Sequence, residues 1–380
     1  MRLCAIARDN DMSIYEELGI RPVINACATL TKLGGSIMPP EVVAAMEDAS
    51  HCFVDLEELQ SKVGDQIARL TRNEAAYVSS GAAAGIVLAV AACITGQDRT
   101  RMDLIPNDAG PKDEAIVFKS HRNGYDHAVR MVGVKMVEIG TAQHTDPAEL
   151  AAAITDRTSA FVWFQGGMTG RADFPIEQVI EICSARGVPV IVDAAAQLPP
   201  VENLWTFTQK GAVCAIFSGG KDLRGPQSSG LVVGRRWLIE AMRPNGNPNA
   251  GIGRPMKVGK EEMAGLLAAV QRYVSLDHVA RRERDERVVR EWCTALGDLH
   301  GVRAQRSFPN EAGQPLPRCE VLLEEGALLK LDALMQALRD GTPAIAVAAA
   351  GERGLYLNPM TLTDEEAVVV GHRLRELLAG

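Results

Sequence analysis

The sequence predicts an α/β protein with one wide, mainly parallel seven-stranded sheet and a smaller α+β domain at its C-terminal end. Between about residues 75 and 235, short β-branched runs alternate with amphipathic stretches, which is typical of βα units. The length of 380 residues is enough for two or three domains with a large core. Both observations favour a large sheet domain followed by a smaller one.

The main body is expected to contain seven strands separated by amphipathic helices. The strands are expected at Ala76–Ser79, Ala115–Phe118, Lys135–Glu138, Ala160–Phe164, Pro189–Val192, Val213–Phe217 and Gly230–Val233. The helices are expected at Ala82–Ile94, Asn123–Val132, Pro147–Ile154 and Pro175–Arg186. Several of these helices open with Pro or close with Gly, as helix ends prefer.

The C-terminal part has a different pattern. Met242–Pro255 is rich in Gly and Pro and has no period, so we expect a loop between domains. Apolar residues at helical spacing then predict one long helix from Met263 to about Leu296. Further strands are expected near Glu320–Leu323, Ile345 and Leu355–Leu357, and further helices at Leu329–Leu338 and Asp364–Leu378.

Composition and charge exclude several classes of protein. Hydrophobic residues make up 47% and charged residues 23%, as in an ordinary globular protein. No apolar run reaches the roughly 18 residues that span a bilayer, and the N-terminal residues lack a signal core, so we expect a cytoplasmic protein without a membrane partner. A net charge of −8 argues against nucleic acid binding. The eight cysteines show neither metal-ligand nor disulfide spacing, so no metal is expected.

The most informative motif surrounds Lys221. The run Phe217–Gln227 (FSGGKDLRGPQ) directly follows a hydrophobic strand, which places the lysine at the carboxyl edge of the sheet, where ligands of α/β proteins bind. An amine held there can form a Schiff base with an aldehyde if its surroundings disfavour the ammonium. The alternative is an exposed loop lysine.

A second signal is Asp193, which ends the apolar strand in Val188–Gln197 (VPVIVDAAAQ). A buried carboxylate is unfavourable unless it is paired. The protonated ring nitrogen of pyridoxal phosphate is one suitable partner, because an anion opposite it keeps the ring an electron sink. The alanines that follow, Ala195 among them, would let a flat ring lie close to the sheet. A helix-capping role is the alternative.

Two further strand ends complete the pattern. In Val78–Gly85 (VSSGAAAG), a Ser/Gly turn opens an alanine-rich helix, whose free amides form an anion site that suits a phosphate; an ordinary N-cap by Ser79 or Ser80 is the alternative. After the strand that ends at Phe118 comes His121, with Tyr125 and His127 as competing rings.

The order of these parts, from phosphate turn to Asp193 to Lys221, resembles the fold-type I pyridoxal-phosphate enzymes of the aspartate aminotransferase superfamily. In that superfamily a ring at the position of His121 stacks on the cofactor. Four motifs narrow the resemblance to the selenocysteine-synthase-like family: Ile20–Ala26, Leu33–Ser36, Val54–Gln60 and Ser218–Gln227. That family includes L-seryl-tRNA(Sec) selenium transferase and D-glucosaminate-6-phosphate ammonia-lyase, and the likeness covers about residues 14 to 375.

The resemblance implies a fold-type I chain in three parts: an N-terminal segment contributing to the active site, residues 1–45; a large cofactor-binding domain, residues 46–254; and a small domain, residues 255–380. A glycine pair downstream of the lysine, Gly251 and Gly253, is placed as in serine hydroxymethyltransferase, where such a pair reaches the neighbouring subunit's cofactor. The implied assembly is a homodimer or a larger oligomer, with a plain domain linker as the alternative for this loop.

These observations identify the candidate site residues. Lys221, Asp193 and His121 are the expected catalytic residues. The expected pyridoxal-phosphate ligands are Ser80, Gly81, Ala82, His121, Asp193, Ala195, Ser218, Lys221, Gly251 and Gly253. The candidates for substrate binding are Asn25, Arg122, Arg254 and Arg353, with Arg224 as a further guanidinium, since Arg pairs with carboxylate or phosphate. Met360 stands where family members often carry an arginine.

The expected reaction is α-proton removal by Lys221 followed by β-elimination and ammonia release from a small amino acid or amino-sugar acid. A racemase or an aminotransferase would use the same residues. A selenium transferase would need a basic tRNA-binding extension, and only about a dozen unremarkable residues precede Ser13. A non-catalytic regulatory protein is disfavoured by the presence of both Lys221 and Asp193.

Overall fold

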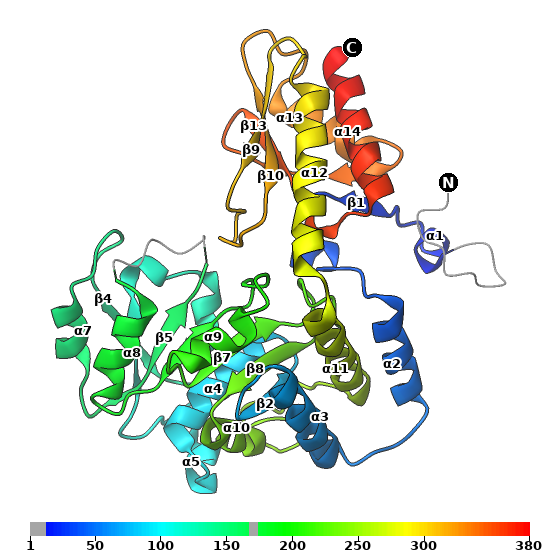
Figure 1. Cartoon of the computed structure of the whole chain (residues 1–380). Coiled ribbons are helices and arrows are strands. Elements are labelled where there is room, and N and C mark those ends of the chain that lie inside the picture. The colour runs from blue at the N-terminus through cyan, green and yellow to red at the C-terminus, as the bar shows by residue number, and fades with distance from the viewer. Residues whose placement is uncertain (1–12, 167–173) are drawn as a thin grey trace. The chain divides into compact units, whose positions relative to one another are not determined.

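The computed structural model describes residues 13–166 and 174–380, and the chain divides into two compact units (Figure 1). The large unit contains Gly34–His278 and Pro309–Pro315. The small unit contains the described residues up to Leu33, together with Val279–Phe308 and Leu316–Gly380. Each unit has its own hydrophobic core.

The large unit is built on a seven-stranded sheet in the order β2-β8-β7-β6-β5-β3-β4. Its strands are β2 (Ala75–Ser79), β3 (Glu114–Phe118), β4 (Lys135–Ile139), β5 (Thr158–Phe164), β6 (Val190–Asp193), β7 (Cys214–Ser218) and β8 (Gly230–Gly234). All neighbours pair in parallel except β8, which is antiparallel to both β2 and β7. The predicted mainly parallel seven-stranded sheet is therefore confirmed, and each strand lies within two residues of its expected limits.

Helices cover both faces of this sheet (Figure 1). They are α2 (Pro40–Ser50), α3 (Leu56–Leu70), α4 (Ala82–Thr95), α5 (Arg99–Leu104), α6 (His127–Arg130), α7 (Pro147–Ala153), α8 (Ile176–Ser184), α9 (Asn203–Gln209), α10 (Arg236–Met242) and α11 (Lys260–Ser275). Side chains of α3, α8, α9 and α11 share a core with one face, and those of α4, α6 and α10 share a core with the other. Because both faces are covered, strands such as β3 are buried at every position.

The edge strand β2 is completed by a side chain. Gln60 of α3 donates from Nε2 to the carbonyl of Val78 at 2.7 Å and accepts from its N–H at 2.9 Å. The side-chain amide of Gln60 thus pairs with both the N–H and the C=O of Val78, which an edge strand would otherwise leave unpaired. This contact fixes the strand directly before the Ser/Gly turn.

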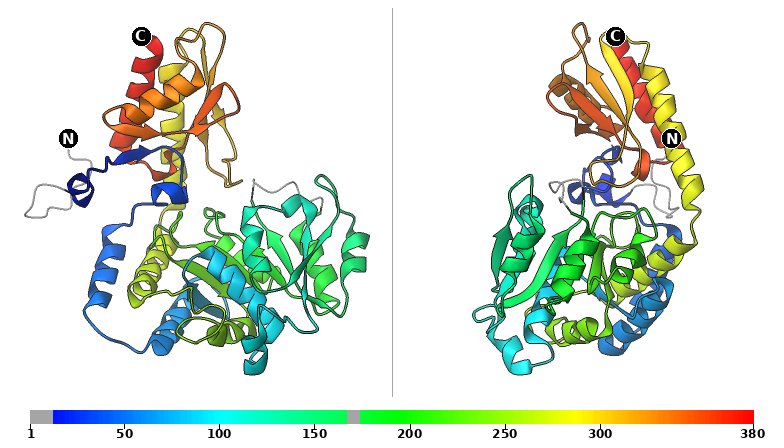
Figure 2. Two further views of the ribbon diagram at one scale, coloured as in Figure 1. Left: turned by 180° about the vertical axis from the view of Figure 1, so that it is seen from behind. Right: turned by 60° about the vertical axis from the view of Figure 1, so that its left-hand side comes forward.

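The small unit is an α+β domain, as predicted. Its elements are α1 (Ile14–Glu17), β1 (Val23–Asn25), α12 (His278–Leu296), β9 (Val302–Ser307), β10 (Arg318–Leu323), α13 (Leu331–Asp340), β11 (Ala344–Ala346), β12 (Ala348–Ala349), β13 (Gly354–Leu357) and α14 (Asp364–Ala379). Strands β12, β13, β10 and β9 form an antiparallel sheet, and β1 pairs in parallel with β11. Figure 2 shows α12 and α14 side by side, where Trp292 Nε1 donates to the carbonyl of Ala367 at 2.8 Å.

Three expectations need correction. The long helix is two helices, because Leu276 is extended and ends α11 before α12 begins. Met242–Pro255 lies within the large unit rather than between domains, since its ends are joined by the bridge between Gly246 and Gly253. The two compact units also depart from the expected domain limits, because residues 255–278 pack with the large unit through α11, and β1 joins the small unit.

Candidate active site

The expected chemical residues gather at one edge of the large sheet. Strands β2, β3, β5, β6 and β7 run in the same direction, so their carboxyl ends lie at the same edge. Gly81, His121, Asp193 and Lys221 each follow or end one of these strands. This is the edge at which α/β sheets bind their ligands.

Asp193 is a buried carboxylate with little compensation. The residue is 9% exposed. Among the described residues, the one hydrogen bond to its carboxylate comes from the N–H of Ala195, which lies 3.0 Å from Oδ1. Burial raises the pKa of this carboxyl, and the Ala195 bond and the charge of Lys221 oppose that rise only in part. The site therefore favours an additional cation beside Asp193.

Lys221 has the complementary property. Burial lowers the pKa of its ammonium, and the charges of Asp193 and, to a smaller extent, Glu311 act in the opposite direction. A lysine with a lowered pKa has a larger fraction of neutral amine, which is the form that reacts with an aldehyde or takes a proton. Lys221 is therefore not an ordinary exposed loop lysine, which was the alternative.

The loop that carries Lys221 is held by residues 34–37 and by α11. Ser36 Oγ donates to the carbonyl of Gly220 at 2.9 Å, and Arg224 Nε donates to the carbonyl of Ile37 at 2.8 Å. On its other side, Tyr273 Oη donates to Asp222 at 2.7 Å. Arg224 thus has a structural role beside its place among the candidate guanidinium groups.

The turn before α4 is open to an anion. Gly81 is the N-cap residue with φ of +126°, a conformation that favours glycine, and no side chain of the described residues caps the helix. A Cβ built on Gly81 would meet no described atom within 4 Å apart from its neighbours in the chain, so there is open space on that side of the turn. The Ser79 hydroxyl donates to the carbonyl of Gly81 at 2.8 Å and does not cap the amides. The helix dipole and these amides together favour a phosphate.

His121 is the buried ring among the three candidates. It is 1% exposed and lies edge-on to Trp163 at 4.7 Å and to Phe118 at 5.2 Å between ring centroids. Tyr125 is 61% exposed, and His127 is exposed too, with its ring nitrogen 3.0 Å from Arg130. Burial at the end of β3 favours His121 over the other two rings, and its stacking on a cofactor stays a prediction.

This set of side chains fits pyridoxal phosphate. A buried acid without a full counter-charge suits the ring nitrogen, an amine with a lowered pKa suits the aldehyde, and an uncapped helix N-terminus suits the phosphate. Ala195 and Ser218 lie at the same edge, where the N–H of Ser218 donates to the carbonyl of Ala195 at 3.3 Å.

Close packing within the same chain explains why the loop after α10 carries a pair of glycines. A Cβ on Gly253 would lie 2.7 Å from both the carbonyl oxygen of Asn245 and Cδ2 of Leu88, and one on Gly251 would lie 2.9 Å from the same carbonyl. These close approaches require glycine whether or not a phosphate binds there. A role for Gly251 and Gly253 at a neighbouring subunit stays a prediction.

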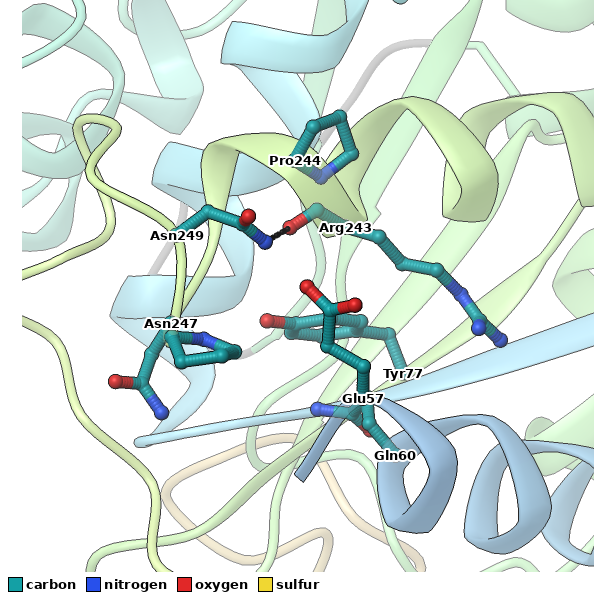
Figure 3. Close-up of a pocket in the computed structure, with 8 residues that line it drawn as sticks. Glu57, Gln60, Tyr77, Arg243, Pro244, Asn247 and Asn249 are labelled. Carbon is teal, nitrogen blue, oxygen red and sulfur yellow. Dashed lines mark hydrogen bonds between the residues drawn. The ribbon is translucent and has the colours of Figure 1, made fainter. Parts of the chain in front are cut away.

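The same loop lines a pocket of about 230 Å³ next to β2 (Figure 3). Its walls are Glu57, Gln60, Tyr77, Arg243, Pro244, Asn247, Pro248 and Asn249. Burial raises the pKa of Tyr77 to about 12, against a hydrogen bond from Gln60 and the charge of Arg243, so its hydroxyl stays protonated at neutral pH. None of the expected site residues lines this pocket.

The candidates for substrate binding have different surroundings. Arg122 donates from Nε to Asp126 at 2.5 Å and also pairs with Glu138, so its charge is already matched. The amide of Asn25 holds a turn in the small unit, donating to the carbonyl of Ala28 at 2.7 Å and accepting from the N–H of Cys27 at 2.9 Å. Arg254 in the large unit and Arg353 in the small unit are exposed. Their roles toward a substrate stay predictions.

Sequence reasoning did not find Glu311. This residue follows β9 in the chain, far from the motifs of the large sheet, but belongs to a loop that packs with the large unit and acts electrostatically on Lys221. The run Pro309–Pro315 (PNEAGQP) carries turn-forming residues but no motif, so only its packing reveals it.

No helix among residues 13–166 and 174–380 has the length and apolar character needed to span a bilayer.

Comparison with known proteins places the chain in a family. The model of the L-seryl-tRNA selenium transferase family, SelA, matches residues 23–287. D-glucosaminate-6-phosphate ammonia lyase of Salmonella typhimurium is 33% identical over 96% of this chain and 98% of its own length. A 5'-C-glycyluridine monooxygenase-decarboxylase of a Streptomyces species is also 33% identical, over 96% and 92% of the two chains. L-seryl-tRNA(Sec) selenium transferase of Solidesulfovibrio magneticus is 25% identical over 92% and 80%.

A solved structure gives the same result for the fold. That of D-glucosaminate-6-phosphate ammonia-lyase superposes with a TM-score of 0.84 at 32% identity, covering 97% of this chain and 99% of the other. The expected fold-type I architecture and the expected membership of a family of pyridoxal-phosphate-dependent enzymes are thereby confirmed. On the family match and on this identity over nearly the whole length, the chain belongs to the SelA family of fold-type I pyridoxal-phosphate enzymes.

Proposed function

We propose that the protein binds pyridoxal phosphate at the Lys221 edge of the sheet and releases ammonia from a small amino acid or amino-sugar acid by β-elimination. One observation carries this proposal: a buried acid with a raised pKa and a lysine with a lowered pKa act on each other at the ligand-binding edge. Structural ion pairs show the opposite shifts, because each partner then stabilises the charge of the other.

The residues that would hold the cofactor divide by chemistry. The phosphate would lie against Ser80, Gly81 and Ala82 at the N-terminus of α4, and the ring nitrogen opposite Asp193. The remaining neighbours would be His121, Ala195 and Ser218. When bound, pyridoxal phosphate supplies an aldehyde that bonds to amines and a ring that withdraws electrons from the substrate's α-carbon.

Lys221 is then the proton carrier of the reaction. As a neutral amine it would take the α-proton, and as an ammonium it would give a proton to the departing β-hydroxyl, which leaves as water. The dehydrated product would then take up one water at its imine carbon, which breaks the C–N bond and releases ammonia and the 2-keto acid. Asp193 would keep a proton at the ring nitrogen, because a buried carboxylate opposite that nitrogen would stabilise its positive charge. The hydrogen bonds of Ser36 and Arg224 hold the lysine loop in place during both transfers.

The ammonia-lyase branch supports a substrate with a hydroxyl next to the amine-bearing carbon. The relative at 33% identity is named for D-glucosaminate 6-phosphate, an amino-sugar acid of this kind. Arg254 and Arg353 are the exposed candidates for its acid groups, whereas Arg122 is already held by two carboxylates.

A second relative supports a different reaction as the alternative. The monooxygenase-decarboxylase is equally similar to this chain, so oxidative decarboxylation is the alternative that the comparisons favour specifically. A racemase or an aminotransferase would use the same lysine and acid. The selenium transferases are more distant, at 25% identity, and tRNA is not a proposed partner.

We also propose a homodimer or larger assembly in the cytoplasm. Phe53, just before α3, is fully exposed, and Val54 beside it is 48% exposed. Large apolar side chains in such positions favour a protein contact. The mass in solution tests the assembly, and cell fractionation tests the location.

The experiment for the proposed function has two parts. Borohydride reduction of the protein with pyridoxal phosphate, followed by peptide mapping, should place the pyridoxyl group on Lys221 and on no lysine in a Lys221→Ala variant. The loaded protein is then screened against D- and L-amino acids and D-glucosaminate 6-phosphate for equal release of keto acid and ammonia. Oxygen uptake with carbon dioxide release would support the alternative, and labelling of another lysine would refute the proposed site.

A further inference from the structure

The loop Pro309–Pro315 follows β9, a strand of the small unit, yet it packs as part of the large unit. Its contacts with the segments after β5 and β6 hold the backbone around Glu311 next to the sheet edge that carries Asp193 and Lys221.

The loop is closed by its own side chains. Asn310 Oδ1 accepts from the N–H of Gln314 at 3.0 Å and from that of Ala312 at 3.1 Å, while its Nδ2 donates to Gln314 Oε1 at 2.7 Å. Both Asn310 and Gln314 are 4% exposed. Glu311 lies between Asn310 and Ala312, so the backbone on both sides of it is fixed.

Two glutamines bind this closed loop to the sheet edge. Gln197, four residues after Asp193, donates from Nε2 to the carbonyl of Ala312 at 2.9 Å. In return Gln314 donates from Nε2 to the carbonyl of Leu198. The backbone of Gly166, just after β5, also approaches, since a Cβ there would lie 3.3 Å from the carbonyl oxygen of Ala312.

The electrostatics agree with this placement. Burial lowers the pKa of Lys221, and two carboxylates oppose it: Asp193 first and Glu311 second. Glu311 itself is exposed, whereas Asp193 is buried. A cationic ring nitrogen at Asp193 would neutralise that acid, and among the described residues Glu311 would then be the other carboxylate that acts on the lysine.

We propose that Glu311 is a positioning residue of the active site, held by the loop Pro309–Pro315 so that its carboxylate stabilises the ammonium of Lys221 between the two proton transfers. The inference rests on the proposed function. The proton balance is simple: Lys221 gains the α-proton, remains an ammonium beside Glu311, and returns to the amine when it protonates the leaving hydroxyl.

The test is a pH titration of the visible absorption of the cofactor bound at Lys221, in wild type and in Glu311→Gln. Removal of a nearby negative charge makes the cationic form less stable, so the midpoint should fall by about 0.5 pH units or more. Turnover should fall several-fold at unchanged KM, and Glu311→Asp should restore part of both effects. Glu325→Gln is the matched control, an exposed glutamate of the small unit.

A midpoint shift in Glu311→Gln but not in Glu325→Gln supports the proposal. Superimposable titrations of wild type and Glu311→Gln, or equal shifts in both variants, overturn it. If the protein binds no pyridoxal phosphate, the proposed function fails separately. The same midpoint shift is then sought by NMR of the dimethylated Lys221 amine, and its absence overturns the role of Glu311 as well.

Discussion

Two buried aspartates at the same edge of the large sheet have opposite environments. Asp126, after β3, is 2% exposed and accepts from Arg122 Nε at 2.5 Å and from Arg130 at 3.2 Å. Burial alone would raise the pKa of its carboxyl, but these hydrogen bonds and charges outweigh burial and lower it. Within residues 13–166 and 174–380, the one hydrogen bond to the side chain of Asp193, at the end of β6, comes from a backbone N–H at 3.0 Å, and its pKa is raised by burial.

The difference between the two environments distinguishes a carboxylate that stabilises the fold from one that is suited to binding a ligand. A buried carboxylate with its own arginines stabilises the fold and needs nothing further, whereas one without them lowers the stability of the protein until a cation arrives. We therefore propose that Asp126 stabilises the turn after β3 and that Asp193 binds the ligand. The predictions below test this contrast, beginning with the largest effect.

The largest effect is expected for Asp193→Asn. The variant should still bind pyridoxal phosphate through Lys221 but lose turnover by roughly 100-fold or more, because an amide does not keep the ring nitrogen protonated. Turnover is measured per labelled Lys221, so loss of cofactor cannot imitate the result. Undiminished turnover would remove Asp193 from the mechanism.

Asp126→Asn should act on stability instead. Loss of the charge-assisted hydrogen bonds from Arg122 and Arg130 should reduce the free energy of unfolding by about 2 kcal/mol at neutral pH. Since the folded pKa lies below the unfolded one, the effect is complete above about pH 4, the unfolded value, and disappears as pH falls through the folded pKa. Denaturant unfolding at neutral and acidic pH measures this, and loss of turnover in molecules that remain folded would contradict the assignment.

The smallest effect is expected for Arg122→Gln. Its guanidinium is partly exposed, at 32% of the side chain, so the variant should lose only about 1 kcal/mol of stability. If Arg122 belongs to the architecture, the dissociation constant of the substrate should change less than twofold, with Arg254→Gln as the comparison variant. A tenfold weaker binding in Arg122→Gln alone would return it to the substrate site.

Much of the large unit was predictable from sequence because all strands of its sheet except the edge strand β4 are buried on both faces. Such strands form short apolar runs with sharp limits, and a polar residue directly after one, such as Asp193 or Lys221, is placed at the carboxyl edge by topology alone. The order of these strand-end residues along the chain then indicated the family. Hence the placement of Asp193 and Lys221 at one edge of the sheet needed no tertiary information.

The rest depended on contacts between distant parts of the chain. Pairing of β1 with β11 joins residues more than 300 positions apart, and no local pattern near Val23 indicates it. The place of Glu311 follows from Gln197 and Gln314, whose amides bind backbone carbonyls more than 100 residues away. The glycines of the Met242–Pro255 loop indicated a linker, although they are required by close packing inside the large unit.

The central claim is that Asp193 carries a charge which the cofactor, rather than the protein, balances. The direct test measures the unfolding temperature of wild type and Asp193→Asn at neutral pH, each with and without pyridoxal phosphate. Because the folded pKa of Asp193 is raised, its charge lowers the stability of the cofactor-free protein at pH values above that pKa. The account predicts that the cofactor-free variant is at least as stable as cofactor-free wild type, and that pyridoxal phosphate raises the unfolding temperature more in wild type. A cofactor-free variant that is less stable than wild type and gains as much from pyridoxal phosphate would contradict it.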